Sequence, residues 1–434
     1  MKQVLATVLI GTLVLSSCKP KYEKPESSAG DLDVTRFVMI GGSHTSGYMD
    51  DALYYEGQQY SIANLVSAQL QKVGSGPFYQ PYMSSNSVGV SGQGMSRFKL
   101  GYKTDCLGVT SLSPVRLASS GDVAAFGSNV YNSSQTFGNF GVPGMTVTVV
   151  NVPSYGALNP FFGRMSSSGT ASVLGDAMAS SPTCFALFVG IEDVLPYAQG
   201  GASNGTMVQG ATFSIAYEQI VQSLTANGAK GVVSLIPDIT EMPYFTTIPY
   251  NGLNLTPDKV ASLNAIYNPI GISFQEGPNG FMIQDPTAGT FGVRNMVAGE
   301  LVLLSTPLDS VKCNSMGSVF PFRNEFVLTL DELSLIRAQI ADYNNAITAI
   351  ASTYNLAIAK PNEVVKNLQS GIVYNGITLS AKFVSGGAYS LDGIHFNPRG
   401  NAIISNEFIR ALNDKYNASI PAINAVNYPS VTFP

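Results

Sequence analysis

Histidine is scarce in this chain of 434 residues, which contains only two, His44 and His395. If the protein uses a histidine as a general base, one of these two must supply it. Basic residues are not in excess either, since 23 Lys and Arg stand against 28 Asp and Glu, for a net charge of −5. Proteins that bind nucleic acid present a surplus of positive charge, so this composition argues against a nucleic-acid partner.

Patterns typical of metal sites are also missing. Besides Cys18 the chain has three cysteines, Cys106, Cys184 and Cys313, and their spacing matches no metal site. We therefore predict neither a metal nor a cofactor. In an oxidising compartment two of these cysteines can pair, but the sequence leaves the pairing open. Cys184 lies beside an apolar strand, which also suits a buried and inert thiol.

A long apolar run is found only at the N-terminus. Lys2 precedes the run Val4–Leu15, which is too short to cross a bilayer and suits the hydrophobic region of a signal peptide. The following Leu15-Ser16-Ser17-Cys18 resembles the bacterial lipobox, in which the cysteine is diacylated and becomes the mature N-terminus. We predict a lipoprotein signal peptide over residues 1–18 and a membrane anchor at Cys18. The alternative is an ordinary signal peptide with an incidental cysteine.

Residues 19–33 are predicted to form a flexible tether. They contain prolines, charges of both signs and Ser27-Ser28-Ala29-Gly30, which leaves little apolar surface to bury. Lys19, directly after Cys18, is not the aspartate associated with retention in the inner membrane. The predicted location is therefore the cell envelope, with the chain lipid-anchored in the outer membrane.

Residues 34–434 are predicted to form a single α/β domain, because apolar strand-like runs alternate with helical patterns. Two stretches with weak periodicity, about 75–137 and 239–326, are predicted to be irregular insertions, the first with a short hairpin. The predicted strands are 36–40, 146–150, 185–189, 231–236 and 356–359; the predicted helices are 62–70, 213–224, 333–350 and 398–414. This order predicts a three-layer α/β/α sandwich with a mainly parallel, flavodoxin-like sheet.

Ligands bind at the carboxyl ends of the strands in such sheets, so the turn after the first strand is a candidate site. There Ser43 lies in Gly41-Gly42-Ser43-His44-Thr45-Ser46-Gly47, at the mouth of the sheet where a nucleophile would be placed. The alternative is a plain strand-to-loop turn, because Gly and Ser are common turn residues.

A second candidate segment precedes the last predicted helix. In Asp392-Gly393-Ile394-His395, a carboxylate three residues before a histidine can turn back toward the imidazole. It can then hold one ring nitrogen and raise the basicity of the other. The alternative is a structural Asp–His pair that caps the helix.

Together these segments resemble the SGNH (GDSL) hydrolase family. Its first block, Gly-Asp-Ser-x-x-x-Gly, is similar to residues 41–47, and its last, Asp-x-x-His, to residues 392–395. Its second block is similar to Asn139-Phe140-Gly141-Val142-Pro143-Gly144, and its third, Gly-x-Asn-Asp, to Gly190-Ile191-Glu192-Asp193. The blocks occur in family order between Val38 and about Tyr416.

The resemblance implies a serine ester hydrolase with a Ser-His-Asp triad. Ser43 would attack an ester carbonyl, His395 would move the proton and Asp392 would orient His395. The backbone N–H groups of Ser43 and Gly144 would hold the oxyanion, with a side chain of the third block as a further donor. The implied partner is an ester-bearing small molecule, a lipid or an acylated glycan.

The chain departs from the family pattern twice. Gly42 replaces the aspartate of the first block, and Glu192 stands in place of the oxyanion asparagine. An ionised carboxylate only accepts hydrogen bonds, so Glu192 would repel an oxyanion. Three alternatives remain: Glu192 is protonated by burial, it points away, or the site is inactive and serves binding. His44, beside Ser43, is either a substrate contact, a second base or a packing residue.

Two functions are therefore compatible with the sequence. The first is an ester hydrolase that acts outside the cytoplasm through Ser43, His395 and Asp392. The second is a catalytically impaired surface lipoprotein of the same fold that binds a glycan or a protein partner.

Overall fold

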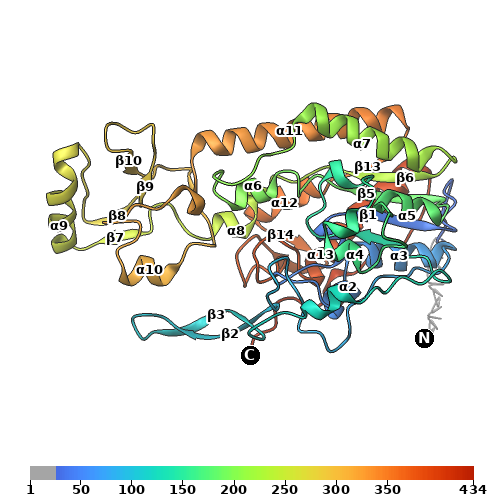
Figure 1. Cartoon of the computed structure of the whole chain (residues 1–434), viewed down its shortest axis with the longest axis horizontal. Coiled ribbons are helices and arrows are strands. Elements are labelled where there is room, and N and C mark those ends of the chain that lie inside the picture. The colour runs from blue at the N-terminus through green and yellow to red at the C-terminus, as the bar shows by residue number, and fades with distance from the viewer. Residues whose placement is uncertain (1–25) are drawn as a thin grey trace, which may run out of the picture.

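The computed structural model describes residues 26–434 of the chain (Figure 1). The predicted signal peptide, Cys18 and the first part of the predicted tether lie outside the described residues. Between residues 26 and 434, no helix combines the length and the apolar character needed to span a membrane.

The described end of the predicted tether is packed against the domain. The Asp31 N–H donates to the carbonyl of Tyr416 at 2.8 Å, and the Ser419 N–H donates to the carbonyl of Ser28 at 2.9 Å. Leu32 is buried in the main core. The prediction of a free segment as far as residue 33 is therefore wrong for residues 26–33, because these backbone bonds and Leu32 fix them to the C-terminal helix.

The centre of the domain is a five-stranded parallel sheet with the strand order β13-β6-β5-β1-β4. The strands are β1 (Phe37–Gly41), β4 (Asn139–Gly141), β5 (Cys184–Phe188), β6 (Lys230–Ser234) and β13 (Ala357–Ala359). Every residue of β1 and β5 is buried, as expected of continuous apolar runs that are covered on both faces. Counted along the chain, this order is the flavodoxin-like arrangement, which confirms the predicted topology.

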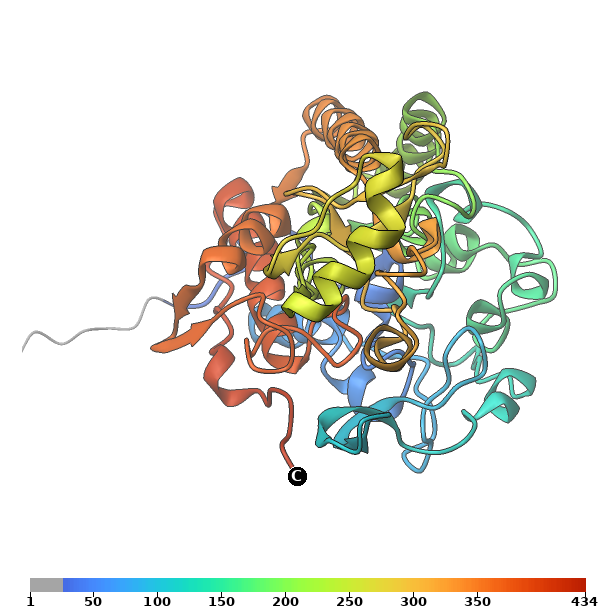
Figure 2. The same ribbon diagram turned by 90° about the vertical axis from the view of Figure 1, so that its left-hand side faces the viewer.

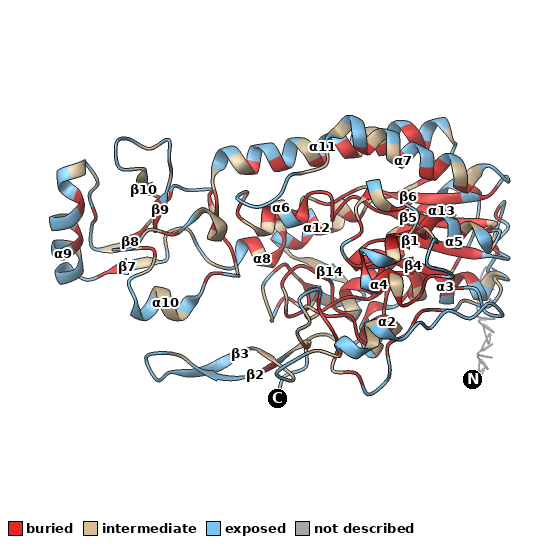
Figure 3. Cartoon of the chain, viewed as in Figure 1, coloured by how far each residue is buried: buried red, intermediate tan, exposed pale blue. Residues whose placement is uncertain are grey.

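Helices cover both faces of the sheet and complete the predicted three layers (Figure 1). One face carries α3 (Ile62–Leu70) and α13 (Pro398–Tyr416), and the other carries α5 (Val173–Ala179), α7 (Gly210–Thr225) and α11 (Leu330–Thr353). Helix α3 begins where Ser61 accepts the N–H of Asn64, and α11 begins with a capping box between Thr329 and Glu332. Buried residues concentrate in the sheet and on the helix faces that contact it (Figure 3).

Residues 146–150 do not form the predicted strand. Val147–Val149 is instead a 3-10 helix, and the edge of the sheet is β4. Both carboxylate oxygens of the buried Asp193 accept the N–H of Val147, at 3.1 and 3.0 Å. A side chain thus satisfies a donor that a strand would have paired with its neighbour, so the β-branched run alone was misleading.

The two predicted insertions extend beyond the same end of the sheet (Figure 1). Within residues 75–137 lies an antiparallel hairpin of β2 (Phe98–Thr104) and β3 (Thr110–Arg116). Residues 239–326 are more ordered than predicted, since they contain α8 (Pro243–Thr246), β7 (Leu253–Leu255), α9 (Pro257–Tyr267), β8 (Gly277–Asn279), β9 (Met282–Gln284), β10 (Val293–Asn295), β11 (Leu301–Val302) and α10 (Leu308–Cys313). This second insertion has two small apolar clusters of its own, one around Phe281 and Phe322 and one around Leu263 and Tyr267. Figure 2 shows it in front of the sheet, with α9 nearest the viewer.

The other α-helices and strands of the described chain lie outside these groups. They are α1 (Ser43–Ser46), α2 (Tyr55–Gln59), α4 (Pro160–Gly163), α6 (Leu195–Gln199), β12 (Val327–Leu328), α12 (Pro361–Ser370), β14 (Ile372–Tyr374) and β15 (Ile377–Leu379). Strand β12 pairs with β11 and so closes the second insertion, and β14 and β15 form a hairpin.

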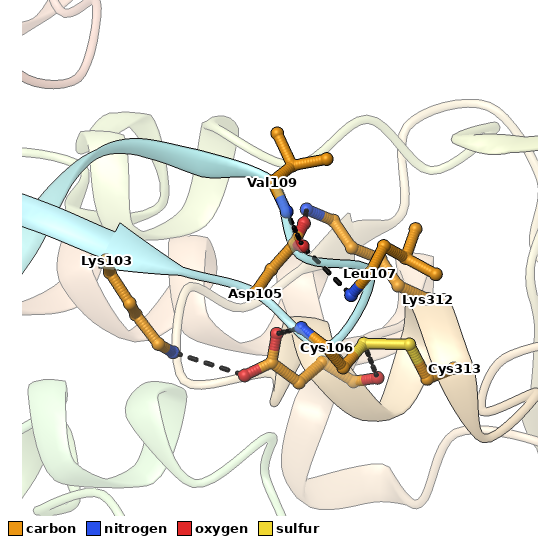
Figure 4. Close-up of a disulfide and its surroundings, with 8 residues drawn as sticks. Lys103, Asp105, Cys106, Leu107, Val109, Lys312 and Cys313 are labelled. Atoms are coloured by element: carbon orange, nitrogen blue, oxygen red, sulfur yellow. Dashed lines mark hydrogen bonds and ion pairs between the residues drawn. A yellow bond between two sulfur atoms is a disulfide. The ribbon is translucent and has the colours of Figure 1, made fainter.

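A disulfide joins the two insertions and resolves the open cysteine pairing. Cys106, at the tip of the β2–β3 hairpin, is bonded to Cys313, at the end of α10 (Figure 4). Ion pairs flank the bond, with Lys312 at 2.7 Å from Asp105 and Lys103 at 3.3 Å from Asp309. Cys184 is a free thiol inside the sheet. Burial raises the pKa of this thiol to about 12, which makes it inert.

We expect the double substitution Cys106→Ser/Cys313→Ser to loosen the two insertions and to leave the sheet intact. The disulfide closes a long loop, so its loss should lower the stability of the joined insertions by about 2–4 kcal/mol. Hydrogen exchange should therefore accelerate in residues 98–116 and 308–313, but not in β1 and β5. An equal loss of protection in the sheet would contradict this division.

Candidate active site

Three predicted residues meet at the carboxyl edge of the sheet. Ser43 is the first residue of α1, directly after β1, and the Asp392–His395 segment precedes α13. The Nε2 atom of His395 lies 2.8 Å from the Oγ atom of Ser43, and its Nδ1 atom lies 3.0 Å from the Oδ2 atom of Asp392. This is the order of contacts in which a carboxylate orients an imidazole and the imidazole activates a hydroxyl.

The Asp392 carboxylate is held in one orientation. Its Oδ1 atom accepts the backbone N–H groups of Ile394 and His395, each at 2.8 Å. Burial raises the pKa of Asp392, but the nearby His395 and the hydrogen bonds outweigh burial and bring this pKa to about 2. Asp392 is therefore ionised throughout the physiological range.

The pKa of His395 is shifted the other way. Burial lowers it, but the charge of Asp392 and the hydrogen bond to it dominate, so the pKa of His395 is raised above its ordinary value of 6.5. A more basic imidazole is a stronger proton acceptor for Ser43, provided that the pH is high enough to leave it neutral.

Glu192 points at Ser43 and does not point away. It follows β5, is 6% exposed, and its Oε1 atom accepts the backbone N–H of Ser43 at 2.5 Å. The predicted alternative in which the Glu192 side chain points away is therefore wrong. This N–H is one of the two backbone donors that were predicted to bind an oxyanion. The Glu192 carboxylate therefore occupies one of these two donors.

Gly42 and Glu192, which the sequence presents as separate departures, form one steric arrangement. A Cβ atom added at Gly42 would lie 2.2 Å from both carboxylate oxygens of Glu192. Any side chain at position 42 would therefore collide with Glu192 in its present position. The two positions are 150 residues apart in sequence, so no local pattern connects them.

Gly144 lies in the turn after β4, the neighbour of β1 in the sheet. It has φ +77°, a left-handed conformation that favours glycine, and no group within residues 26–434 accepts a hydrogen bond from its N–H. The side chain of Asn159, which the sequence analysis missed, supports this turn by donating to the carbonyl of Pro143 at 2.9 Å. The only local signal for Asn159 is its position before Pro160, where it caps α4.

His44 is enclosed beside the triad. It is 4% exposed, its ring lies 4.7 Å from the ring of His395, and its Nδ1 atom is 3.5 Å from the Oγ atom of Ser43. The rings of Phe188 and Phe396 surround it. Burial, followed by the neighbouring His395, lowers the pKa of His44 to about 3, so this imidazole stays neutral. Of the three predicted roles for His44, this placement favours packing.

Comparison with known proteins adds little. No protein-family model matches the chain, and no curated protein matches it either. Among solved structures, a mutant of an acetyl-xylooligosaccharide esterase from Geobacillus stearmophilus is similar, with 10% identity, a TM-score of 0.37, and coverage of 88% of this chain and 96% of that one. An α/β-hydrolase enzyme from the metagenome of Lake Arreo, Spain, has 10% identity, a TM-score of 0.35 and the same coverage. Both TM-scores are low, so the fold assignment depends on the strand order and the site depends on its own geometry.

We expect Gly42→Ala to lower the free energy of unfolding by about 1–3 kcal/mol, because the new methyl group overlaps the Glu192 carboxylate. In a Glu192→Ala background the same substitution should cost much less. Urea unfolding of the four proteins measures both costs. Gly169→Ala is the matched control, since a Cβ atom there meets no atom within 4 Å. An equal cost in the two backgrounds would contradict the coupling.

His44 should also make the protein sensitive to acid. Between pH 6.5 and its folded pKa of about 3, the unfolded chain binds a proton at His44 that the folded chain excludes. Stability is therefore lost as the pH falls below 6.5, by up to about 1.4 kcal/mol per pH unit for this one proton. His44→Leu should remove that slope between pH 6 and pH 4.5. Parallel stability curves for the variant and the wild type would show that His44 is not responsible.

Proposed function

We propose that this protein is a serine hydrolase that cleaves carboxylic esters outside the cytoplasm. The observation that carries the proposal is the hydrogen-bonded series Ser43–His395–Asp392 at the carboxyl edge of a parallel sheet. The order of sequence blocks that resembles the SGNH hydrolase family supports the same reaction class. The substrate is an ester-bearing small molecule, a lipid or an acylated glycan.

The mechanism follows from the positions of the three side chains. His395 Nε2 takes the proton of the Ser43 hydroxyl as the Oγ atom attacks the ester carbonyl carbon. The protonated His395, stabilised by Asp392, then gives that proton to the leaving alcohol, which leaves an acyl group on Ser43. A water molecule, deprotonated by His395, then attacks the acyl carbon. The bond between this carbon and the Ser43 Oγ atom breaks, His395 returns the proton to Oγ, and the carboxylic acid leaves.

Charge on the reacting oxygen needs donors, and here the site is restricted. The Gly144 N–H has no partner within residues 26–434, whereas the Ser43 N–H is bonded to Glu192. We infer that the Glu192 carboxylate must move away from this N–H before the Ser43 N–H can stabilise an oxyanion. Loss of one such donor slows catalysis by about 10²–10³-fold, which describes a slow enzyme rather than an inactive one.

Export is supported by a second observation. The Cys106–Cys313 disulfide forms and persists most readily in an oxidising compartment. This agrees with the proposed lipid anchor at Cys18 and with a location in the cell envelope, for which the outer membrane remains our proposal.

One specific observation favours the alternative function, a surface lipoprotein of the same fold that binds a glycan or a protein partner. It is the bond between Glu192 and the nucleophile's own N–H, which opposes the chemistry that the triad would perform. The two functions differ in whether the wild-type Ser43 reacts.

A fluorophosphonate probe and p-nitrophenyl acetate test the proposal. We expect the wild-type protein to be labelled at Ser43 and to hydrolyse the acetate slowly, and Ser43→Ala to do neither. Glu192→Asn should raise kcat, by up to about 10²–10³-fold, because it frees the Ser43 N–H and adds an amide donor. Activity in Glu192→Asn alone would identify the natural protein as a binding protein derived from an enzyme. A folded protein that remains inert in both forms would rule out the hydrolase.

A further inference from the structure

The loop between α1 and α2 is bonded to the segment that carries Asp392, more than 300 residues away in sequence. Two backbone N–H groups of this loop donate to that segment. The N–H of Asp50 donates to the hydroxyl of Ser390 at 3.0 Å, and the N–H of Asp51 donates to the Oδ2 atom of Asp392 at 2.9 Å. In return, the N–H of Leu391 donates to the Oδ1 atom of Asp50 at 2.9 Å. The Oδ2 atom of Asp392 that receives the Asp51 N–H is the same atom that contacts His395.

The backbone of this loop is constrained in an uncommon way. Asp50 and Asp51 are consecutive residues with φ of 54° and 58°. This is the left-handed region, which residues other than glycine rarely adopt. In this conformation both N–H groups point toward residues 390–392. Consecutive residues of this kind persist only where the surrounding contacts fix them, and such sites cluster where function needs a fixed geometry.

The Asp51 carboxylate has its own partners. Its Oδ2 atom lies 2.6 Å from the Nη2 atom of Arg116, and its Oδ1 atom accepts the hydroxyl of Tyr48 at 3.2 Å. Arg116 ends β3, and its guanidinium lies over the ring of Phe98, with its carbon 3.8 Å from the ring centroid. The cation that pairs with Asp51 is therefore supplied by the β2–β3 hairpin, whose tip is bonded through Cys106 to the second insertion.

Asp51 is held against the Oδ2 atom of Asp392 through its backbone N–H, and we propose that Arg116 of the hairpin controls the negative charge that Asp51 presents to His395 from this position. The proposal rests on the proposed hydrolase for its catalytic meaning. Its structural content, the control of His395 by a residue of the inserted hairpin, stands independently of turnover.

Several titratable or charged groups surround Asp51 and His395, and a test must separate the effect of Asp51 on His395 from theirs. Asp51 is faced by Tyr48 of its own loop, Arg116 of β3, Asp392 and Tyr244 of α8. His395 is faced by Asp392, Glu192, Asp51, the ring of Tyr48 and the neutral ring of His44. The charge of Asp51 contributes to the raised pKa of His395. Removal of Asp51's charge and removal of its partner's charge should therefore change the proton affinity of His395 in opposite directions.

The small number of histidines makes this measurable without an assay of activity. With only His44 and His395 in the chain, isotope-labelled imidazole resonances can follow both through a pH titration by NMR. Arg116→Gln leaves the Asp51 carboxylate without its cation and should raise the pKa of His395 by roughly half a pH unit, about a threefold gain in proton affinity. Asp51→Asn keeps the N–H and should lower it by a similar amount. Arg116→Lys keeps the charge and should restore the wild-type value.

Lys103→Gln is the matched control, because it removes a cation from the same hairpin near its tip, where Lys103 pairs with Asp309. We expect no change at His395 in this variant. Asn adopts the left-handed conformation more readily than most residues, so Asp51→Asn retains the loop even if Arg116→Gln unfolds, and then carries the test alone.

The outcomes separate the two proposals. Opposite shifts in the two variants support the inference, and they do so even if the wild-type protein hydrolyses no ester, a result that would count only against the proposed function. An unchanged His395 titration in folded Asp51→Asn would overturn the inference, whatever the activity. If the protein is an active hydrolase, Asp51→Asn should also move the acid limb of its kcat profile to lower pH and leave KM unchanged.

Discussion

The buried carboxylate of Asp392 is the constraint on which the rest of the site depends. A charge inside a protein is unstable unless hydrogen bonds replace the water that it has lost. Asp392 meets this requirement with the N–H groups of Asp51, Ile394 and His395 and with the imidazole of His395. These backbone donors come from two parts of the chain, so the charge of Asp392 joins the loop after α1 to the segment before α13.

The inserted segments share this constraint. The first contributes Arg116, which forms an ion pair with Asp51, the residue whose N–H donates to Asp392. The second contacts the same segment, because the N–H of Tyr244 donates to the carbonyl of Gly393 at 2.9 Å. Both insertions therefore support the segment around Asp392, although neither supplies Ser43, Asp392 or His395. Both insertions also add residues to the main core, among them Val90 and Phe137 of the first and Phe245 and Leu303 of the second.

The sequence was sufficient for the parts of the fold that local patterns determine. Apolar runs such as 185–189 identify sheet strands because a strand covered on both faces must be apolar throughout, and the capping residues before α3 and α11 mark helix starts. Residues 146–150 were misread because a distant carboxylate, Asp193, takes the N–H that a strand would use. The short elements of residues 239–326 form small clusters of their own, without long periodic segments that a sequence pattern can reveal. The triad residues could be located because their spacing is local or follows strand ends. The contact between Gly42 and Glu192 could not, because it joins positions that only the folded sheet brings together.

The bond between Cys106 and Cys313 also has a topological consequence. It converts the chain between these residues into a covalent ring that contains β4, β5, β6 and Glu192. Ser43 precedes the ring, and Asp392 and His395 follow it, so the proposed catalytic groups lie on two tails that fold back onto a closed loop. A single proteolytic cut within residues 107–312 would open the ring but leave one connected molecule, with both tails still attached. The protein can thus be cut once in its larger insertion and still keep Ser43 and His395 in one covalently connected molecule, for as long as the disulfide remains oxidised.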